Sequence, residues 1–173
     1  MMQTSLLHQK KTAADVSLRS AAAEDEEFLY RVYASTRADE MALTDWTEAQ
    51  KEAFLRMQSN AQRQSYLAQY PQAEYSVIAK DGAPIGRLIV DRTGRDLLLM
   101  DIALLPEYRN AGIGTRLIEE LLDEADRTAR PVRLHVETFN PAMNLYKRLG
   151  FIETGELSFY HEMTRQPQAG EEK

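Results

Sequence analysis

The feature that most constrains the fold of this sequence is an apolar run at residues 97–105 that ends at Pro106. A nearly unbroken apolar run is typical of a central strand with both faces covered, and proline cannot donate to the ladder of such a strand. After a short turn, apolar residues recur at helical spacing opposite an acidic face; they are Leu117, Ile118, Leu121, Leu122 and Ala125. The segment predicts a buried strand, a turn and a helix over residues 112–128.

The turn between this strand and this helix has the pattern Arg109-x-x-Gly112-x-Gly114. Glycine has no Cβ, so backbone N–H groups there can approach a ligand closely. The first turn of a helix also has unpaired N–H groups and the positive end of the helix dipole, which suits a phosphate. The pattern lacks the third glycine of the dinucleotide fingerprint and the Lys-Ser/Thr of a P-loop. The turn predicts a phosphate cradle made of Arg109, Asn110, Ala111, Gly112, Ile113, Gly114 and Thr115.

A second pattern lies further along the chain. Residues 140–151 read Asn-Pro-Ala-Met-Asn-Leu-Tyr-Lys-Arg-Leu-Gly-Phe and follow an alternating strand at residues 132–136. Together the two patterns resemble the GNAT superfamily of acetyl-CoA-dependent N-acetyltransferases, which combines (Arg/Gln)-x-x-Gly-x-(Gly/Ala) with Asn-x-x-Ala-x-x-x-Tyr-x-x-x-Gly-Phe. The spacing departs slightly from the family pattern. Counted from Asn140, the alanine falls at Ala142, and the small or polar position that precedes the tyrosine is Asn144. The resemblance covers about residues 16–164.

The resemblance implies an α/β fold of the GNAT type, with a central twisted mixed sheet and helices on both faces. We expect one such domain over residues 16–164, a flexible arm over residues 1–15 and a polar tail over residues 165–173. The spacing of Thr47 and Gln50 predicts a capping box that opens a long helix. The expected strands are residues 16–19, 74–79, 85–90, 97–105, 132–136, 151–156 and 159–164, and the expected helices are 21–34, 47–70, 112–128 and 140–149. Residues 37–45 form a connection of undetermined form.

The resemblance also implies how acetyl-CoA is held. The pyrophosphate lies on the cradle, and the pantetheine arm enters between two diverging strands and pairs with backbone groups of Ala103 and Leu104. Asn140 is a family position that contacts the cofactor, and it also suits a helix cap. Tyr146 matches the family's tyrosine, whose phenol protonates or hydrogen-bonds the leaving sulfur. The implied reaction is direct attack of a primary amine on acetyl-CoA through a tetrahedral intermediate, with no metal.

The group that accepts the amine's proton is left open by the sequence. Asp101 is the charged residue inside the apolar run, and a carboxylate there should be paired or face a cavity. His135 matches a place where some GNAT relatives carry a catalytic carboxylate, and histidine titrates near neutral pH. Glu137 and Glu162 are outside candidates, and a water chain without a dedicated base is a further alternative. In the superfamily the first two helices form a wall of the acceptor pocket, which makes Tyr33, Arg37 and Trp46 candidate substrate contacts.

Composition limits the classes of function. The 173 residues contain no cysteine and carry a formal net charge of −6, which excludes disulfides and thiolate metal sites and disfavours nucleic acid or anionic membranes as partners. No apolar stretch reaches the length of a membrane span. We expect a cytoplasmic monomer or homodimer that uses acetyl-CoA and an amine acceptor. The alternative is a non-catalytic acyl-CoA binding or sensing module. The acceptor, whether polyamine, aminoglycoside, amino acid, protein N-terminus or lysine, cannot be chosen from the sequence.

Overall fold

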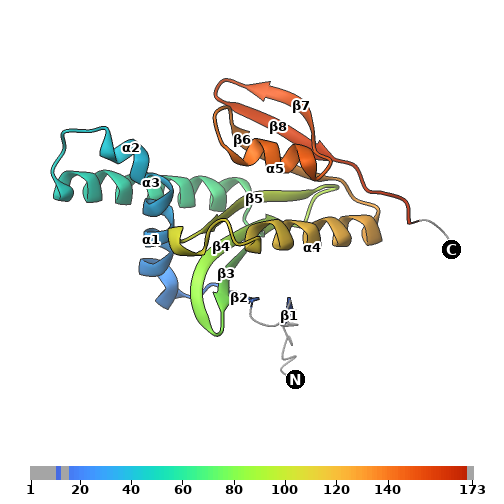
Figure 1. Cartoon of the computed structure of the whole chain (residues 1–173), viewed down its shortest axis with the longest axis horizontal. Coiled ribbons are helices and arrows are strands. Elements are labelled where there is room, and N and C mark those ends of the chain that lie inside the picture. Colours follow the sequence, from blue (N-terminus) through green and yellow to red (C-terminus); the bar gives the residue numbers. More distant parts are fainter. Residues whose placement is uncertain (1–10, 13–15, 171–173) are drawn as a thin grey trace.

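The computed structural model describes residues 11–12 and 16–170, which contain a mixed sheet in the order β1-β2-β3-β4-β5-β6-β8-β7 (Figure 1). Its strands are β1 (Lys11–Thr12), β2 (Val16–Ser20), β3 (Glu74–Lys80), β4 (Ala83–Asp91), β5 (Leu97–Leu104), β6 (Val132–Glu137), β7 (Ile152–Leu157) and β8 (Tyr160–Arg165). The α-helices are α1 (Glu26–Thr36), α2 (Ala38–Ala42), α3 (Glu48–Gln69), α4 (Ile113–Thr128) and α5 (Ala142–Arg148). The mixed sheet with helices on both faces confirms the predicted fold class.

Strands β5 and β6 form the parallel pair of this sheet, and α4 connects them. They pair only over Leu97–Leu99 and Val132–Leu134, and beyond these residues they diverge. Opposite β4, the register of β5 shifts: Ile89 lies across from Asp101 while Val90 lies across from Leu99. Met100 is therefore the extra residue of a β-bulge, which bends a strand locally. The bulge sits where β5 leaves β6.

The two faces of the sheet are covered unequally. On one face, α4 and α5 pack into the main core with buried side chains such as Ile78, Leu97 and Leu134. On the other face, α1 contributes Phe28 and Val32 against the sheet, and α3 lies alongside it (Figure 1). Leu55 is the buried side chain of the 22-residue α3. This helix is therefore held loosely, and space is left between it and the sheet.

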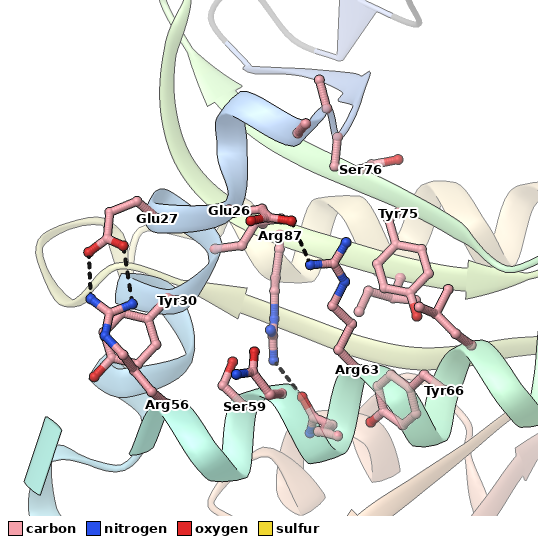
Figure 2. A pocket seen from close by; sticks show the side chains of 18 residues that line it. Glu26, Glu27, Tyr30, Arg56, Ser59, Arg63, Tyr66, Tyr75, Ser76 and Arg87 are labelled. Atoms are coloured by element: carbon pink, nitrogen blue, oxygen red, sulfur yellow. Dashed lines mark hydrogen bonds and ion pairs between the residues drawn. The ribbon is translucent and has the colours of Figure 1, made fainter. Parts of the chain in front are cut away.

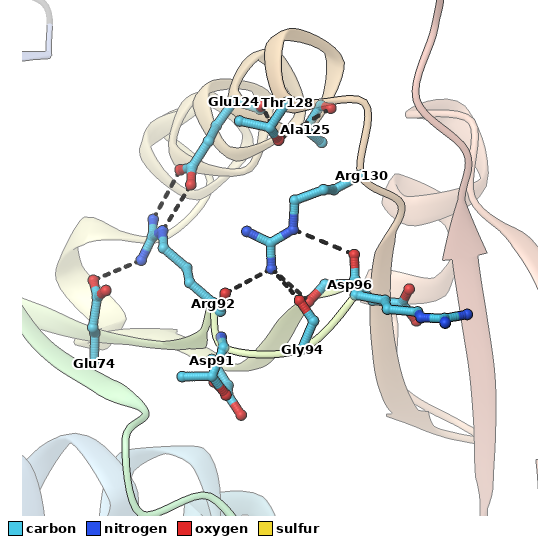
Figure 3. A network of polar contacts seen from close by, with 11 residues as sticks. Glu74, Asp91, Arg92, Gly94, Asp96, Glu124, Ala125, Thr128 and Arg130 are labelled. Atoms are coloured by element: carbon cyan, nitrogen blue, oxygen red, sulfur yellow. Dashed lines mark hydrogen bonds and ion pairs between the residues drawn. The ribbon is translucent and has the colours of Figure 1, made fainter.

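A polar network fixes the end of α4 that is remote from the predicted cradle (Figure 3). Arg92 forms two hydrogen bonds to Glu124 on α4, at 2.9 and 3.0 Å, and one to Glu74 at 2.7 Å. Arg130 donates to the carbonyl oxygens of Arg92 and Gly94, at 2.6 and 2.7 Å. These bonds anchor α4 to the turn between β4 and β5, so the helix is held firmly against the strand that precedes the cradle.

The local predictions agree with the structure except at the starts of two helices. α5 begins at Ala142 with Pro141 as its N-cap, one residue after the predicted cap Asn140. The capping box is confirmed, since the N–H of Gln50 donates to Thr47 Oγ1 and the N–H of Thr47 donates to Gln50 Oε1. The first helix does not start at residue 21: a 3₁₀ turn (Ala23–Asp25) precedes α1, because Asp25 accepts from the N–H of Ala22 and pairs with Arg19. The connection at 37–45 contains the short α2.

The two chain ends are described only in part. Residues 1–10, 13–15 and 171–173 lie outside the described residues, and so does most of the predicted N-terminal arm. Lys11–Thr12 of that arm pair with Val16–Ser17 as β1. In the predicted tail, the N–H of Gln168 donates to Asp126 Oδ1 at 2.7 Å.

Candidate active site

A cavity of about 240 Å³ opens where β5 and β6 diverge. Its lining comes from α1, α3, β4, β5, β6, α5 and β8, so residues far apart in the chain meet there. Among the residues singled out from the sequence, those that line it are Tyr33, Arg37, Asp101, Ala103, His135, Glu137, Asn140 and Tyr146. The two proposed bases and the proposed acid therefore share one cavity.

The predicted cradle lies at the start of α4, directly after β5. Gly112 is the N-cap with φ +79°, and no side chain caps this end among the residues that the structure describes. Asn110 also has positive φ, +60°. A turn of this kind directs successive N–H groups to one side, which makes an anion-binding concavity. A Cβ atom at Gly112 would have no non-neighbouring heavy atom of the described residues within 4 Å, so the space above the turn is open to a ligand.

Arg109 connects the cradle to the rest of the site through its side chain. Its Nε donates to the carbonyl oxygen of Leu104 at 2.9 Å, and its Nη2 donates to Ser35 Oγ at 3.0 Å. The guanidinium thus ties the turn to the end of β5 and to α1. Its contacts indicate that Arg109 positions the cradle, and that a phosphate would meet the backbone of this residue.

Tyr146 on α5 is a buried tyrosine of this cavity. Its ring packs edge-on against Phe151, with centroids 5.6 Å apart. Burial, and secondarily the negative charge of Asp101, raises the pKa of Tyr146 to about 12. The phenol is therefore a protonated hydrogen-bond donor over the whole physiological pH range.

Asp101 is engaged by an arginine that the sequence analysis did not select. Arg87 Nε donates to Asp101 Oδ2 at 2.5 Å, and Arg87 Nη2 donates to Gln62 Oε1 at 3.2 Å. Arg87 is buried, with 9% of its surface exposed. The signal that could have found it is its position as the one charged side chain within the apolar strand 85–90. Oδ2 of Asp101 is therefore already engaged in a charge-assisted hydrogen bond with a guanidinium.

His135 has an acidic neighbour across the sheet. It lies opposite Glu162 in the register of β6 and β8, with 3.4 Å between His135 Nε2 and Glu162 Oε2. Arg133 Nη1 lies 3.5 Å from the same carboxylate. The imidazole is one third exposed and lines the cavity. It can accept a proton from a ligand while Glu162 orients the ring.

The three candidate substrate contacts are placed differently. Tyr33 and Arg37 line the cavity, and Arg37 Nη1 donates to Glu137 Oε1 at 3.2 Å. Trp46 is not among the lining residues; its ring packs edge-on against Phe54, with centroids 5.0 Å apart. Asn140 lies before Pro141, the N-cap of α5, and its Oδ1 accepts from the N–H of Ala142 at 2.9 Å. Tyr66, Gln62 and Tyr160 also line the cavity, and no motif pointed to them.

Two further findings concern metal ions and membranes. Within residues 11–12 and 16–170, no group of three His, Cys, Asp or Glu side chains is placed to hold a metal ion. Across the same part of the chain, no helix is both long and apolar enough to cross a membrane.

Comparison with known proteins agrees with this geometry. The chain is 32% identical over 155 residues to a putative [ribosomal protein bS18]-alanine N-acetyltransferase of Bacillus subtilis, covering 87% of this chain and 89% of the relative. It is 40% identical over 70 residues to a thialysine N-epsilon-acetyltransferase of Bos taurus, covering 39% of this chain and 41% of that relative. The chain thus spans about two fifths of the length of that curated relative.

A solved structure shows the same fold. The PaiA N-acetyltransferase from Thermoplasma acidophilum, in complex with coenzyme A, superposes with a TM-score of 0.67 at 19% identity, covering 87% of this chain and 98% of that one. The model of the Acetyltransferase (GNAT) family matches residues 22–151. That range includes both motifs on which the prediction rested, and the prediction of the family is confirmed. This chain belongs to the GNAT family of acetyltransferases.

Proposed function

We propose that this protein transfers the acetyl group of acetyl-CoA to a primary amine, and that residues 16–164 act as one catalytic domain. The observation that carries the proposal is the divergence of β5 and β6 next to the cradle. It opens a cavity lined by a hydrogen-bond donor, Tyr146, and a proton acceptor, His135.

The residues present fit acetyl-CoA. Backbone N–H groups of residues 110–115 would hold the pyrophosphate, because the turn is open and uncapped. Beyond Leu99, β5 has no pairing to β6, so backbone groups near Ala103 and Leu104 would pair with the pantetheine arm as a further strand does. Asn140 lines the same cavity. Bound acetyl-CoA supplies a thioester carbonyl that an amine can attack.

Two proton movements accompany the transfer. An amine with a pKa of about 10.4 is neutral in roughly one molecule in 2,500 at pH 7, so a base must take its proton. We assign this role to His135, which is oriented by Glu162 and is not held by an arginine as Asp101 is. Tyr146 donates a hydrogen bond to the departing thiolate, since its raised pKa keeps it protonated. Asp101 forms a pair with Arg87 in the lining of the same cavity.

The acceptor is a primary amine of either a small molecule or a protein. Two carboxylates, Asp101 and Glu137, line the cavity. They are paired with Arg87 and Arg37 of the same lining, so charge alone does not select the acceptor. The relatives named above act on a ribosomal-protein alanine and on thialysine. An acceptor panel should therefore contain a peptide with N-terminal alanine, thialysine, lysine and polyamines.

We further propose a cytoplasmic monomer or homodimer with no nucleic-acid or membrane partner. The net charge of −6 supports the absence of a nucleic-acid partner and of an anionic membrane partner. The absence of cysteine is consistent with a reducing compartment.

The first experiment is calorimetric titration of acetyl-CoA into wild type and two leucine variants. Gly112→Leu and Gly82→Leu place the same side chain at the same backbone conformation, φ +79° and +80°, with nothing within 4 Å of either Cβ. Only Gly112 belongs to the cradle. We expect Gly112→Leu to weaken binding more than about tenfold, because the side chain occupies the open space above the turn and keeps the pyrophosphate from its hydrogen bonds with the backbone N–H groups. Gly82→Leu should bind as wild type does. Equal effects of the two substitutions on acetyl-CoA binding would contradict the proposal that the turn at Gly112 holds the pyrophosphate.

Turnover is tested separately, by following thiol release with the acceptor panel. Release with at least one amine is the expected result. Tight acetyl-CoA binding with no release for any amine would favour the non-catalytic binding module.

A further inference from the structure

A second and larger cavity lies beside the reaction cavity, on the same face of the sheet. It encloses about 420 Å³ between the start of α1, α3, and strands β3 and β4 (Figure 2). Its volume is within the range of small-molecule sites, which is about 300–1,000 Å³. The space exists because small side chains face it and because α3 packs loosely on the sheet; the small residues are Ala21, Ala22, Ala23, Ser59 and Ser76.

Polar donors converge on one side of this second cavity. The hydroxyl of Tyr75 is buried and has no hydrogen-bond partner within the described part of the chain. Arg63 extends from α3 past the ring of Tyr75 to Glu26 (Figure 2), where its Nη1 donates to Glu26 Oε1 at 2.9 Å. Burial raises the pKa of Tyr75, while the nearby cations Arg63 and Arg87 act in the opposite direction. A buried hydroxyl without a partner costs stability, so a hydrogen bond to a ligand would be favourable. Because the hydroxyl is closed off from solvent, the ligand's acceptor reaches it only when a neighbouring side chain moves aside.

The lining also has an apolar part and further polar residues; the latter are Glu27, Arg56, Asn60, Gln62 and Arg87. Leu29, Leu67 and Ile89 form apolar walls, and Tyr66 contributes an aromatic ring. The Arg63–Glu26 pair at the rim is more than half exposed on both sides. An exposed ion pair contributes little to stability, so Arg63 can exchange Glu26 for a ligand's anionic group at small cost.

We propose that this second cavity binds a small molecule that carries a carboxylate on an apolar body. The carboxylate accepts hydrogen bonds from Arg63 and from the Tyr75 hydroxyl, and the apolar body lies against Leu29, Leu67 and Ile89. This site is separate from the cradle and from the reaction cavity. The proposal that it binds a carboxylate depends only on residues that line the second cavity.

The wall between the two cavities gives this site a route to the reaction. Gln62, Tyr66 and Arg87 line both cavities, and Arg87 holds Asp101 on the reaction side. A carboxylate that draws Arg87 toward the second cavity weakens its hold on Asp101. This coupling rests on the proposed function, whereas binding itself does not.

The test is calorimetry with 3-phenylpropionate as probe and 3-phenylpropanol as the uncharged control, in the absence of acetyl-CoA. We expect a Kd of about 1 mM or tighter for the carboxylate and at least about tenfold weaker binding of the alcohol. Tyr75→Phe should weaken the carboxylate about fivefold, and Arg63→Gln about tenfold or more. Ser59→Trp, which fills the cavity from α3, should abolish binding.

Matched controls come from residues outside both linings. Tyr70→Phe removes a phenol hydroxyl, and Arg31→Gln removes a cation from α1; both should bind the carboxylate as wild type does. The proposal is overturned if 3-phenylpropionate does not bind wild-type protein, or if Ser59→Trp and Tyr75→Phe, shown to be folded by circular dichroism, bind it as tightly as wild type.

A kinetic measurement then distinguishes two sources of the carboxylate. If the carboxylate belongs to the acceptor itself, 3-phenylpropionate inhibits competitively against the acceptor amine. If it belongs to a separate effector, 3-phenylpropionate changes kcat, and this change is lost in Ser59→Trp. A bound probe that changes neither kcat nor KM would refute the coupling through Arg87.

Discussion

Replacing Tyr146 by phenylalanine tests the proposed acid most directly, because the change removes one oxygen and little else. The ring is buried and packs edge-on against Phe151, and phenylalanine preserves that contact. The hydroxyl belongs to a residue that lines the reaction cavity. We therefore expect the free energy of unfolding to change by less than about 1 kcal/mol.

The size of the catalytic effect follows from the raised pKa. The phenol has a pKa of about 12, and a thiol has one of about 8.5, so full proton transfer to the thiolate is uphill by roughly 5 kcal/mol. Tyr146 must then act as a hydrogen-bond donor to a charged sulfur. Such a bond contributes about 1.5–3 kcal/mol, which predicts a loss of about 10- to 150-fold in kcat.

The assay follows thiol release at saturating acetyl-CoA, with acetyl-CoA affinity measured in parallel by calorimetry. Tyr146→Phe should lower kcat and leave the Kd for acetyl-CoA within about threefold, and the control Tyr70→Phe should match wild type. For wild type, Tyr146 should cause no loss of rate at pH values well below about 12. A Tyr146→Phe enzyme whose kcat stays within about threefold of wild type would refute the assignment.

Other changes test the fold and the base. A Cβ at Gly86 would lie 2.3 Å from the carbonyl oxygen of Ala103, so Gly86→Ala should lower the free energy of unfolding by about 2–4 kcal/mol in urea titrations. The control is Gly94→Ala, whose Cβ would lie 3.8 Å from its nearest neighbour, and this variant should keep the stability of wild type. Hydrogen bonds from Arg19 lower the pKa of Asp25 to about 2, so its stabilisation is complete above the ordinary pKa near 3.8 and is lost as pH falls toward 2. Wild type and Asp25→Asn should therefore differ in stability at pH 6 and converge near pH 2, and a constant difference counts against the ion pair. His135→Gln should remove the acidic limb of the pH profile of kcat/KM; unchanged profiles in both this variant and Asp101→Asn would mean that the proton leaves by another route.

The resemblance of two motifs predicted the family, and local sequence chemistry predicted the turn at residues 109–115 and most boundaries of the elements. Gly112 takes a backbone conformation that favours glycine, and Thr47 with Gln50 forms a cap from residues three apart. Asn140 likewise accepts from the N–H of Ala142, two residues along the chain. Such features involve neighbours in the chain, so a pattern of residue types determines them without knowledge of the fold.

Pairings across the sheet were decided only by the tertiary structure. Arg87 meets Asp101 because the bulge in β5 sets the register against β4, and His135 meets Glu162 because β6 and β8 are neighbours. Trp46, close to the cavity by analogy, packs on Phe54 instead.

The second cavity was equally invisible in the sequence. It depends on how far α3 stands from the sheet, and that separation is fixed by the summed volumes of side chains from several elements. The periodicity of each element predicts which face is buried, but it carries no information about the space that remains when the faces meet.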